Sequence, residues 1–211
     1  MRISWKEKLA IFLIYAVAYA FLYVFPNVYS GFKPVFLRMT ELDTQIPFVP
    51  WTFLVYLSDY ILILTVIFLI GRKDQFYSFT RVSFLLLFIC GIFFIFFPTT
   101  YPRPEYPVVE NPLIRFFMGL VGSLDTPKNC FPSMHVAVTG GAVFSLRHLP
   151  RRLFIFYIFW AVAIFLSTLT TKQHYLVDVL GGVGAVALVA FLEWRVLHPS
   201  HAPLPSNPTT Y

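Results

Sequence analysis

A histidine and an aspartate four residues apart stand at the edge of the last long apolar run. His174 and Asp178 lie on one face of a helix if that helix begins at or before His174. The carboxylate then accepts a hydrogen bond from one ring nitrogen, and the other ring nitrogen keeps a nucleophilic lone pair. Lys172 adds positive charge two residues earlier. This spacing is typical of half of a catalytic dyad.

Two further segments carry groups that suit an anionic ligand. Arg103 stands between Pro102 and Pro104, which would hold its guanidinium in a fixed direction for bidentate contact with an anion. The segment 130–135 reads Cys-Phe-Pro-Ser-Met-His, and its proline suits the first position of a helix. Ser133, free backbone N–H groups and His135 would then fall in the first turn, where a helix attracts phosphate.

Taken together, these groups are two histidines, a hydroxyl and two cations. Few carboxylates accompany Asp178, so the sequence predicts neither a metal cage nor a cofactor. The set suits metal-free phosphoryl transfer, in which fixed positive charge and positioning do most of the work.

The elements that must position these residues are membrane helices. Of the 211 residues, 58% are hydrophobic and 12% are charged, whereas about a quarter are charged in ordinary globular proteins. This excludes an ordinary soluble fold. The net charge of +6 comes from basic residues at the ends of apolar runs, without a patch or stripe, so we do not expect nucleic acid as a partner.

The apolar runs predict an all-α fold, a bundle of six transmembrane helices in a single domain over residues 1–197, followed by a disordered tail at 198–211. Hydropathy alone does not decide whether 133–146 spans, because this run is short and partly polar; its small residues suit a helix packed inside the bundle. The predicted spans are 9–25, 51–70, 82–97, 133–146, 153–169 and 175–194.

The distribution of Lys and Arg predicts the orientation. With six spans, ten of these residues fall on the side of the termini and six on the opposite side, which predicts cytoplasmic termini and an extracytoplasmic site. Two connections are long. We expect 32–50 to be either an amphipathic segment along the outer membrane interface or a connection without a specific role. We expect the proline-rich 98–131 to be a stiff irregular loop.

At its polar residues the chain resembles the type 2 phosphatidic acid phosphatase family, whose motifs are Lys-x6-Arg-Pro, Pro-Ser-Gly-His and Ser-Arg-x5-His-x3-Asp. The matching residues, in order, are Arg103-Pro104, then Pro132-Ser133-Met134-His135 with Met for Gly, then Ser167, His174 and Asp178. Phe96 and Thr168 stand where the family has a lysine and an arginine. Segments 42–51 and 172–175 are similar, more weakly, to the branch of inositol phosphorylceramide synthases and related transferases.

The resemblance implies a role for each catalytic residue. It implies that His174 attacks phosphorus to form a phosphohistidine, that Asp178 orients His174, and that His135 protonates the leaving alkoxide.

It also implies that Arg103, Ser133 and Lys172 hold the non-bridging oxygens of a lipid phosphate in the bilayer. Lys172 would replace the missing arginine, although an ammonium lacks the bidentate fork of a guanidinium.

Three interpretations remain open. With water as the acceptor, the protein is a lipid phosphatase of the outer leaflet; with an alcohol, it is a phosphotransferase. A membrane transporter or scaffold would keep the cations that attract anions but would not need His135 and His174 together.

Overall fold

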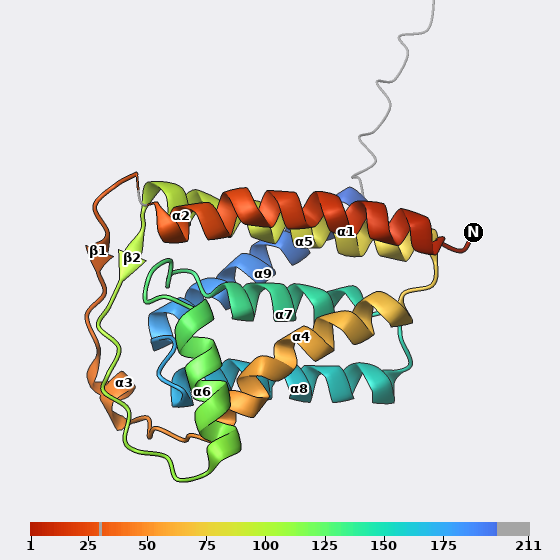
Figure 1. Cartoon of the computed structure of the whole chain (residues 1–211). Coiled ribbons are helices and arrows are strands. Elements are labelled where there is room, and N and C mark those ends of the chain that lie inside the picture. Colours follow the sequence, from red (N-terminus) through yellow and green to blue (C-terminus); the bar gives the residue numbers. More distant parts are fainter. Residues whose placement is uncertain (30, 198–211) are drawn as a thin grey trace, which may run out of the picture.

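The computed structural model describes residues 1–29 and 31–197, so the predicted tail at 198–211 lies outside the described residues. The long helices run between two ends of the molecule, and the shorter elements gather at one of these ends, opposite the N-terminus (Figure 1). The helices of the bundle are α1 (Trp5–Tyr19), the π-helical turn η1 (Ala20–Val24), α2 (Phe25–Val28), α4 (Thr52–Leu69), α5 (Lys73–Phe96), α7 (Met134–Ser145), α8 (Arg151–Thr170) and α9 (Leu176–Leu197).

Five stretches are long and apolar enough to cross a membrane: Trp5–Val28, Thr52–Leu69, Lys73–Phe96, Arg151–Thr170 and Leu176–Val196. Each overlaps one predicted span. The sixth, α7, has 12 residues and is about 18 Å long, which is short of the roughly 30 Å hydrocarbon core. The structure therefore agrees with an integral membrane protein of mostly helical fold but does not confirm the count of six spans.

Helix α7 lies in the middle of the bundle and contacts α4, α5, α8 and α9. Its glycines permit this close packing: a Cβ atom added at Gly141 would overlap Leu86 of α5, and one added at Gly140 would lie 2.9 Å from Val186 Cγ2 of α9. The small residues of this run therefore pack inside the bundle, as expected.

The connection 98–131 is not the irregular loop that its prolines predict. It contributes the strand β2 (Thr99–Thr100), which pairs in parallel with β1 (Val35–Phe36), and the 13-residue helix α6 (Pro112–Leu124). Pro112 occupies the first turn, where no N–H donor is needed, and the Asn111 side chain accepts from the N–H groups of Leu113 and Ile114. Since no proline follows before residue 127, the helix can continue.

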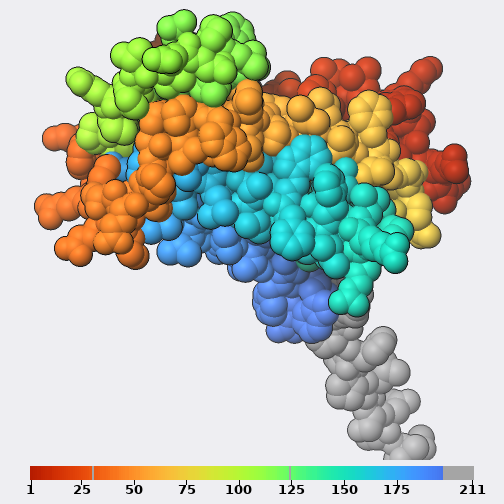
Figure 2. Space-filling view, turned by 90° about the horizontal axis from the view of Figure 1, so that it is seen from below, coloured from red at the N-terminus to blue at the C-terminus, as the bar shows by residue number. Residues whose placement is uncertain are grey.

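Helix α6 packs across the start of α4, where Val121 contacts the cluster around Phe53. The other connection contains β1 and the short helix α3 (Glu41–Gln45). Figure 2 shows α6 and the 31–50 connection side by side at the end of the molecule opposite the N-terminus. They cover the end at which α7 and α9 begin.

Candidate active site

His174 lies in the tight turn between α8 and α9. Helix α8 ends in a left-handed residue, Lys172 (φ 57°), and the N–H groups of Lys172 and Gln173 donate to the carbonyls of Leu169 and Thr168. Helix α9 begins only at Leu176, so the condition that His174 belongs to this helix is not met. The turn, not a helical face, presents the imidazole.

Asp178 nevertheless reaches His174 from the first turn of α9. Its Oδ2 atom accepts from the Tyr175 N–H at 2.9 Å and lies 3.3 Å from His174 Nδ1. The backbone bond fixes the carboxylate, because a side chain at this position of a helix meets the free N–H groups before it. With the ring proton on Nδ1, the lone pair of His174 is on Nε2.

His135 is presented by the first turn of α7. Ser133 is the N-cap residue, and its Oγ accepts from the Val136 N–H at 3.4 Å. The Ser133 N–H donates to the Asp178 carbonyl at 2.9 Å, which ties the start of α7 to the start of α9. Pro132 therefore precedes the cap instead of occupying the first helical position, since a serine oxygen satisfies an N–H group that proline would leave free.

The two imidazoles converge as their motifs predict. Their ring centroids are 6.0 Å apart, with 62° between the planes. His135 Nδ1 lies 3.2 Å from the Tyr56 hydroxyl, and His174 Nδ1 faces Asp178. Within the part of the chain that the structure describes, neither Nε2 atom has a hydrogen-bond partner. Both Nε2 atoms are thus without a protein partner in the described residues.

Sequence reasoning missed the carboxylate behind His135. The Tyr56 hydroxyl donates to Asp125 Oδ2 at 2.6 Å, so its oxygen is an acceptor for a proton on His135 Nδ1. Burial raises the pKa of Asp125, but the charges of His135 and Arg103 outweigh it and lower the pKa below the usual value. One signal could have identified this residue, because Asp125 is the only acidic residue between Glu110 and Asp178.

Arg103 lies at the same site and is mostly buried, with 14% of its side chain exposed. Its Nη1 donates to the Gln173 side chain, its Nη2 donates to the Thr126 carbonyl at 3.2 Å, and Nη2 lies 3.7 Å from Asp125 Oδ2. Its buried Nε has no partner in the structure. The Tyr101 hydroxyl donates to the Gln173 carbonyl. The proline-flanked segment therefore holds both the arginine and the turn that carries His174.

The structure ties Lys172 to the segment that contains α3. Its ammonium donates to the carbonyls of Asp43 and Ile46, because the last carbonyls of a helix such as α3 lack helical partners. The Asp43 carboxylate in turn accepts from the Leu176 N–H at 2.8 Å. Burial lowers the pKa of Lys172. Lys172 therefore fixes the 41–46 segment to the turn, and its role in replacing the family arginine stays a prediction.

A cavity of about 480 Å³ leads away from this site. At one end it is lined by His135, Tyr56 and Asp125, and it continues between α1 and α4. The candidate site therefore opens into a largely apolar space inside the bundle.

Comparison with known proteins gives one informative match. A family model described as the PAP2 superfamily matches residues 36–192, a region that contains Arg103, His135, His174 and Asp178. No curated protein and no solved structure matches the chain. Because the model covers most of the chain, the protein belongs to the PAP2 superfamily, whose members are phosphatases and phosphoryl-transfer enzymes.

Proposed function

We propose that this protein is a membrane-embedded lipid phosphatase that hydrolyses a phosphate monoester or diphosphate through a phosphohistidine. One observation carries the proposal: two imidazoles from separate elements lie 6.0 Å apart, each with Nδ1 engaged and Nε2 free. This separation suits one tetrahedral phosphate between the two rings. Family membership supports phosphatase-type chemistry on phosphate esters.

In the first step, the Nε2 lone pair of His174 attacks phosphorus, and the bond from phosphorus to the lipid oxygen breaks. The departing oxygen takes the electron pair of that bond and a proton from Nε2 of His135. In the second step, water gives a proton to the now neutral His135 and attacks phosphorus. The P–N bond breaks, and His174 regains its lone pair.

Positive charge and backbone donors stabilise the oxygens of the transferring group. The buried Nε of Arg103 has no partner in the described residues and is the donor that we propose for the phosphate. The start of α7, capped by Ser133, adds the positive end of a helix. Asp178 keeps the Nδ1 proton of His174 in place. We do not assign Lys172 to the phosphate, because its ammonium is held by the carbonyls of Asp43 in α3 and of Ile46 at its C-cap.

The orientation is part of the proposal. The site lies at the end of the bundle opposite the N-terminus (Figure 1), and the count of basic residues favours a cytoplasmic N-terminus. The site would then face the outer leaflet, where a lipid headgroup reaches it while the chains stay in the bilayer.

The test is turnover by the detergent-purified full chain with chelator present. Phosphatidic acid and a polyprenyl diphosphate are offered separately, and free phosphate is measured beside any new phosphodiester. We expect free phosphate from the wild type and a loss of at least a hundredfold in His174→Ala and His135→Ala. His148→Ala is the matched control, because His148 is exposed beyond the other end of α7.

Three results would count against the proposal. Wild-type turnover in both histidine variants would exclude the mechanism. A phosphodiester without free phosphate would identify an alcohol as the acceptor, and therefore a phosphotransferase. A wild-type protein without turnover on any lipid phosphate would favour a transporter or scaffold.

A further inference from the structure

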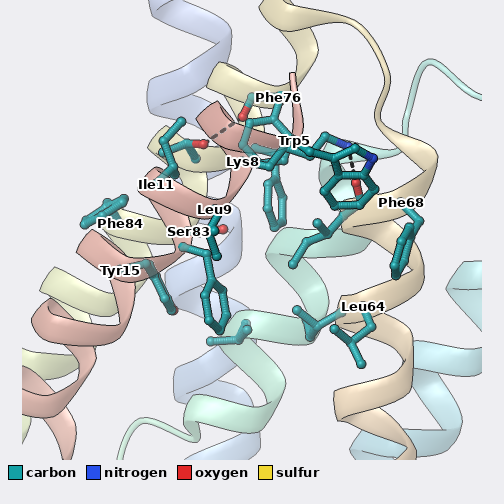
Figure 3. A pocket seen from close by; sticks show the side chains of 16 residues that line it. Trp5, Lys8, Leu9, Ile11, Tyr15, Leu64, Phe68, Phe76, Ser83 and Phe84 are labelled. Atoms are coloured by element: carbon teal, nitrogen blue, oxygen red, sulfur yellow. Dashed lines mark hydrogen bonds between the residues drawn. The ribbon is translucent and has the colours of Figure 1, made fainter. Parts of the chain in front are cut away.

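Two cavities of this molecule adjoin one another between α1 and α4. The cavity of about 480 Å³ begins at His135, and a second cavity of about 270 Å³ lies toward the N-terminal end (Figure 3). Both are lined by Phe12 and Tyr15 of α1, by Ile63 and Leu64 of α4, and by Val138 of α7. They therefore form one continuous groove, which we call the α1–α4 groove.

The length of the groove matches one hydrocarbon chain. Tyr56 lines its beginning, and Phe68, twelve residues later on α4, lines its far end. Twelve residues of helix cover about 18 Å, and one leaflet contributes about 15 Å of the bilayer core. A chain whose headgroup is at His135 would therefore nearly fill the groove.

The far end of the groove is closed. The Lys8 ammonium donates to the carbonyls of Ile67 and Ile70, at 2.6 and 2.8 Å, and joins α1 to the end of α4. The Trp5 and Phe68 rings meet edge to face, with centroids 5.2 Å apart. Figure 3 shows Trp5, Lys8 and Phe68 near one end of the second cavity. These contacts form a floor that a longer chain would have to displace.

The groove is open along its side. Phe12 and Leu64, one on each wall, are each 52% exposed, although both line the groove. In the apolar stretch that includes α1, only 6% of residues are buried inside the molecule, so this helix lies at the periphery of the bundle. A lipid chain can thus enter sideways from the bilayer without passing through water.

We propose that the α1–α4 groove binds one hydrocarbon chain of the lipid whose phosphate is placed between His135 and His174, and that its floor sets an upper limit to chain length. This inference rests on the proposed function and names the substrate class as a lipid phosphate with a chain in the groove. Continuity with the site is the reason for choosing a substrate chain over a bulk bilayer lipid.

The first test uses hexadecyl phosphate with a photoreactive diazirine at the methyl end of its chain. Bound in the groove, it should label residues 5–12 and 63–68 and the part of α5 that lines the second cavity, residues 76–84, in the wild type and equally in His174→Ala. Excess hexadecyl phosphate should reduce the labelling at least tenfold, whereas hexadecanol should not. Equal competition by hexadecanol would show a bulk lipid, and labelling elsewhere would also overturn the inference.

The second test blocks the groove. Ala16 lines it, and its neighbour Val17, 58% exposed, does not. Since one methylene in an apolar pocket changes specificity about 10- to 200-fold, Ala16→Phe should lower kcat/KM at least tenfold for hexadecyl phosphate. It should leave butyl phosphate unchanged, and Val17→Phe should change neither.

The two proposals can fail separately. If Ala16→Phe keeps wild-type turnover and labelling with the long chain, the groove inference is wrong and the phosphatase remains. If the wild type is labelled at the groove but releases no phosphate, the proposed function is wrong and the groove remains a site for a phosphate-bearing chain.

Discussion

Removal of the Tyr56 hydroxyl is the sharpest test of how His135 donates its proton. This hydroxyl donates to Asp125 at 2.6 Å and lies 3.2 Å from His135 Nδ1. It therefore links a carboxylate to the imidazole that we propose as the general acid. In Tyr56→Phe, the ring is kept, but the imidazolium loses the partner on Nδ1 that stabilises its charge and orients Nε2.

The magnitude follows from the bond that is lost. A hydrogen bond to a charged group contributes about 1.5–3 kcal/mol, which corresponds to roughly 10- to 150-fold in rate. We expect Tyr56→Phe to lower kcat/KM by this factor for an alkyl phosphate, whose alkoxide needs a proton to depart. Direct removal in His135→Ala should cost about 10²- to 10⁴-fold.

The assay compares two leaving groups. A nitrophenolate departs without a proton, so nitrophenyl phosphate should lose much less than an alkyl phosphate in both variants. Tyr60→Phe is the matched control, because Tyr60 lies one turn further along α4 and lines the same cavity but has no hydrogen bond to His135 in the structure. An equal loss with both substrates would refute the proposed role of Tyr56 in proton donation by His135 and show that Tyr56 only supports the fold.

Three further predictions follow from the same contacts. Asp178→Asn should lower turnover by about 10²- to 10⁴-fold through the wrong tautomer of the adjacent histidine, while the thermal unfolding midpoint in detergent stays within a few degrees. Gly182→Ala should lower both turnover and the thermal unfolding midpoint, because the added Cβ would lie 2.8 Å from the Ser133 carbonyl oxygen. Gly184→Ala is the control and should change neither, because its added Cβ would have no atom within 4 Å. Burial raises the pKa of Asp43, but hydrogen bonds from Thr40 and Leu176 lower it below the usual value. The ionised carboxylate therefore stabilises the folded protein at a pH above its pKa in the unfolded chain. This stabilisation is lost as the pH falls through the pKa of Asp43 in the folded protein. The unfolding midpoint should therefore drop on acidification below about pH 4, and less so in Asp43→Asn.

The long apolar runs and the motif spacings could be predicted from the sequence because both depend on local patterns. The five candidate spans follow from hydropathy, and the approach of His135 to His174 follows from placing both motifs at the same end of a bundle. Hydropathy does not fix the count of spans, because α7 is too short to cross alone and is defined by packing around Gly140 and Gly141.

The remaining features depend on contacts between distant segments. Asp125 belongs to the site only because α6 forms inside a proline-rich connection and ends beside Tyr56. Lys172 is bound by the carbonyls of Asp43 and Ile46, which lie more than a hundred residues away in the sequence. No periodicity or motif spacing carries this information, since each contact requires the folded arrangement of both partners.

The hydrogen-bond partners of the two histidines differ, and this difference bears on the roles that we propose for them. His174 faces a carboxylate directly, at 3.3 Å, which fixes its Nδ1 proton and stabilises the positive charge that forms on the ring when Nε2 bonds to phosphorus. His135 faces the hydroxyl of Tyr56, and this hydroxyl in turn donates a hydrogen bond to Asp125. A neutral partner holds a proton on the imidazolium less tightly than a carboxylate does, and a general acid must release its proton in every cycle. This difference supports our proposal that His174 is the nucleophile and His135 the general acid.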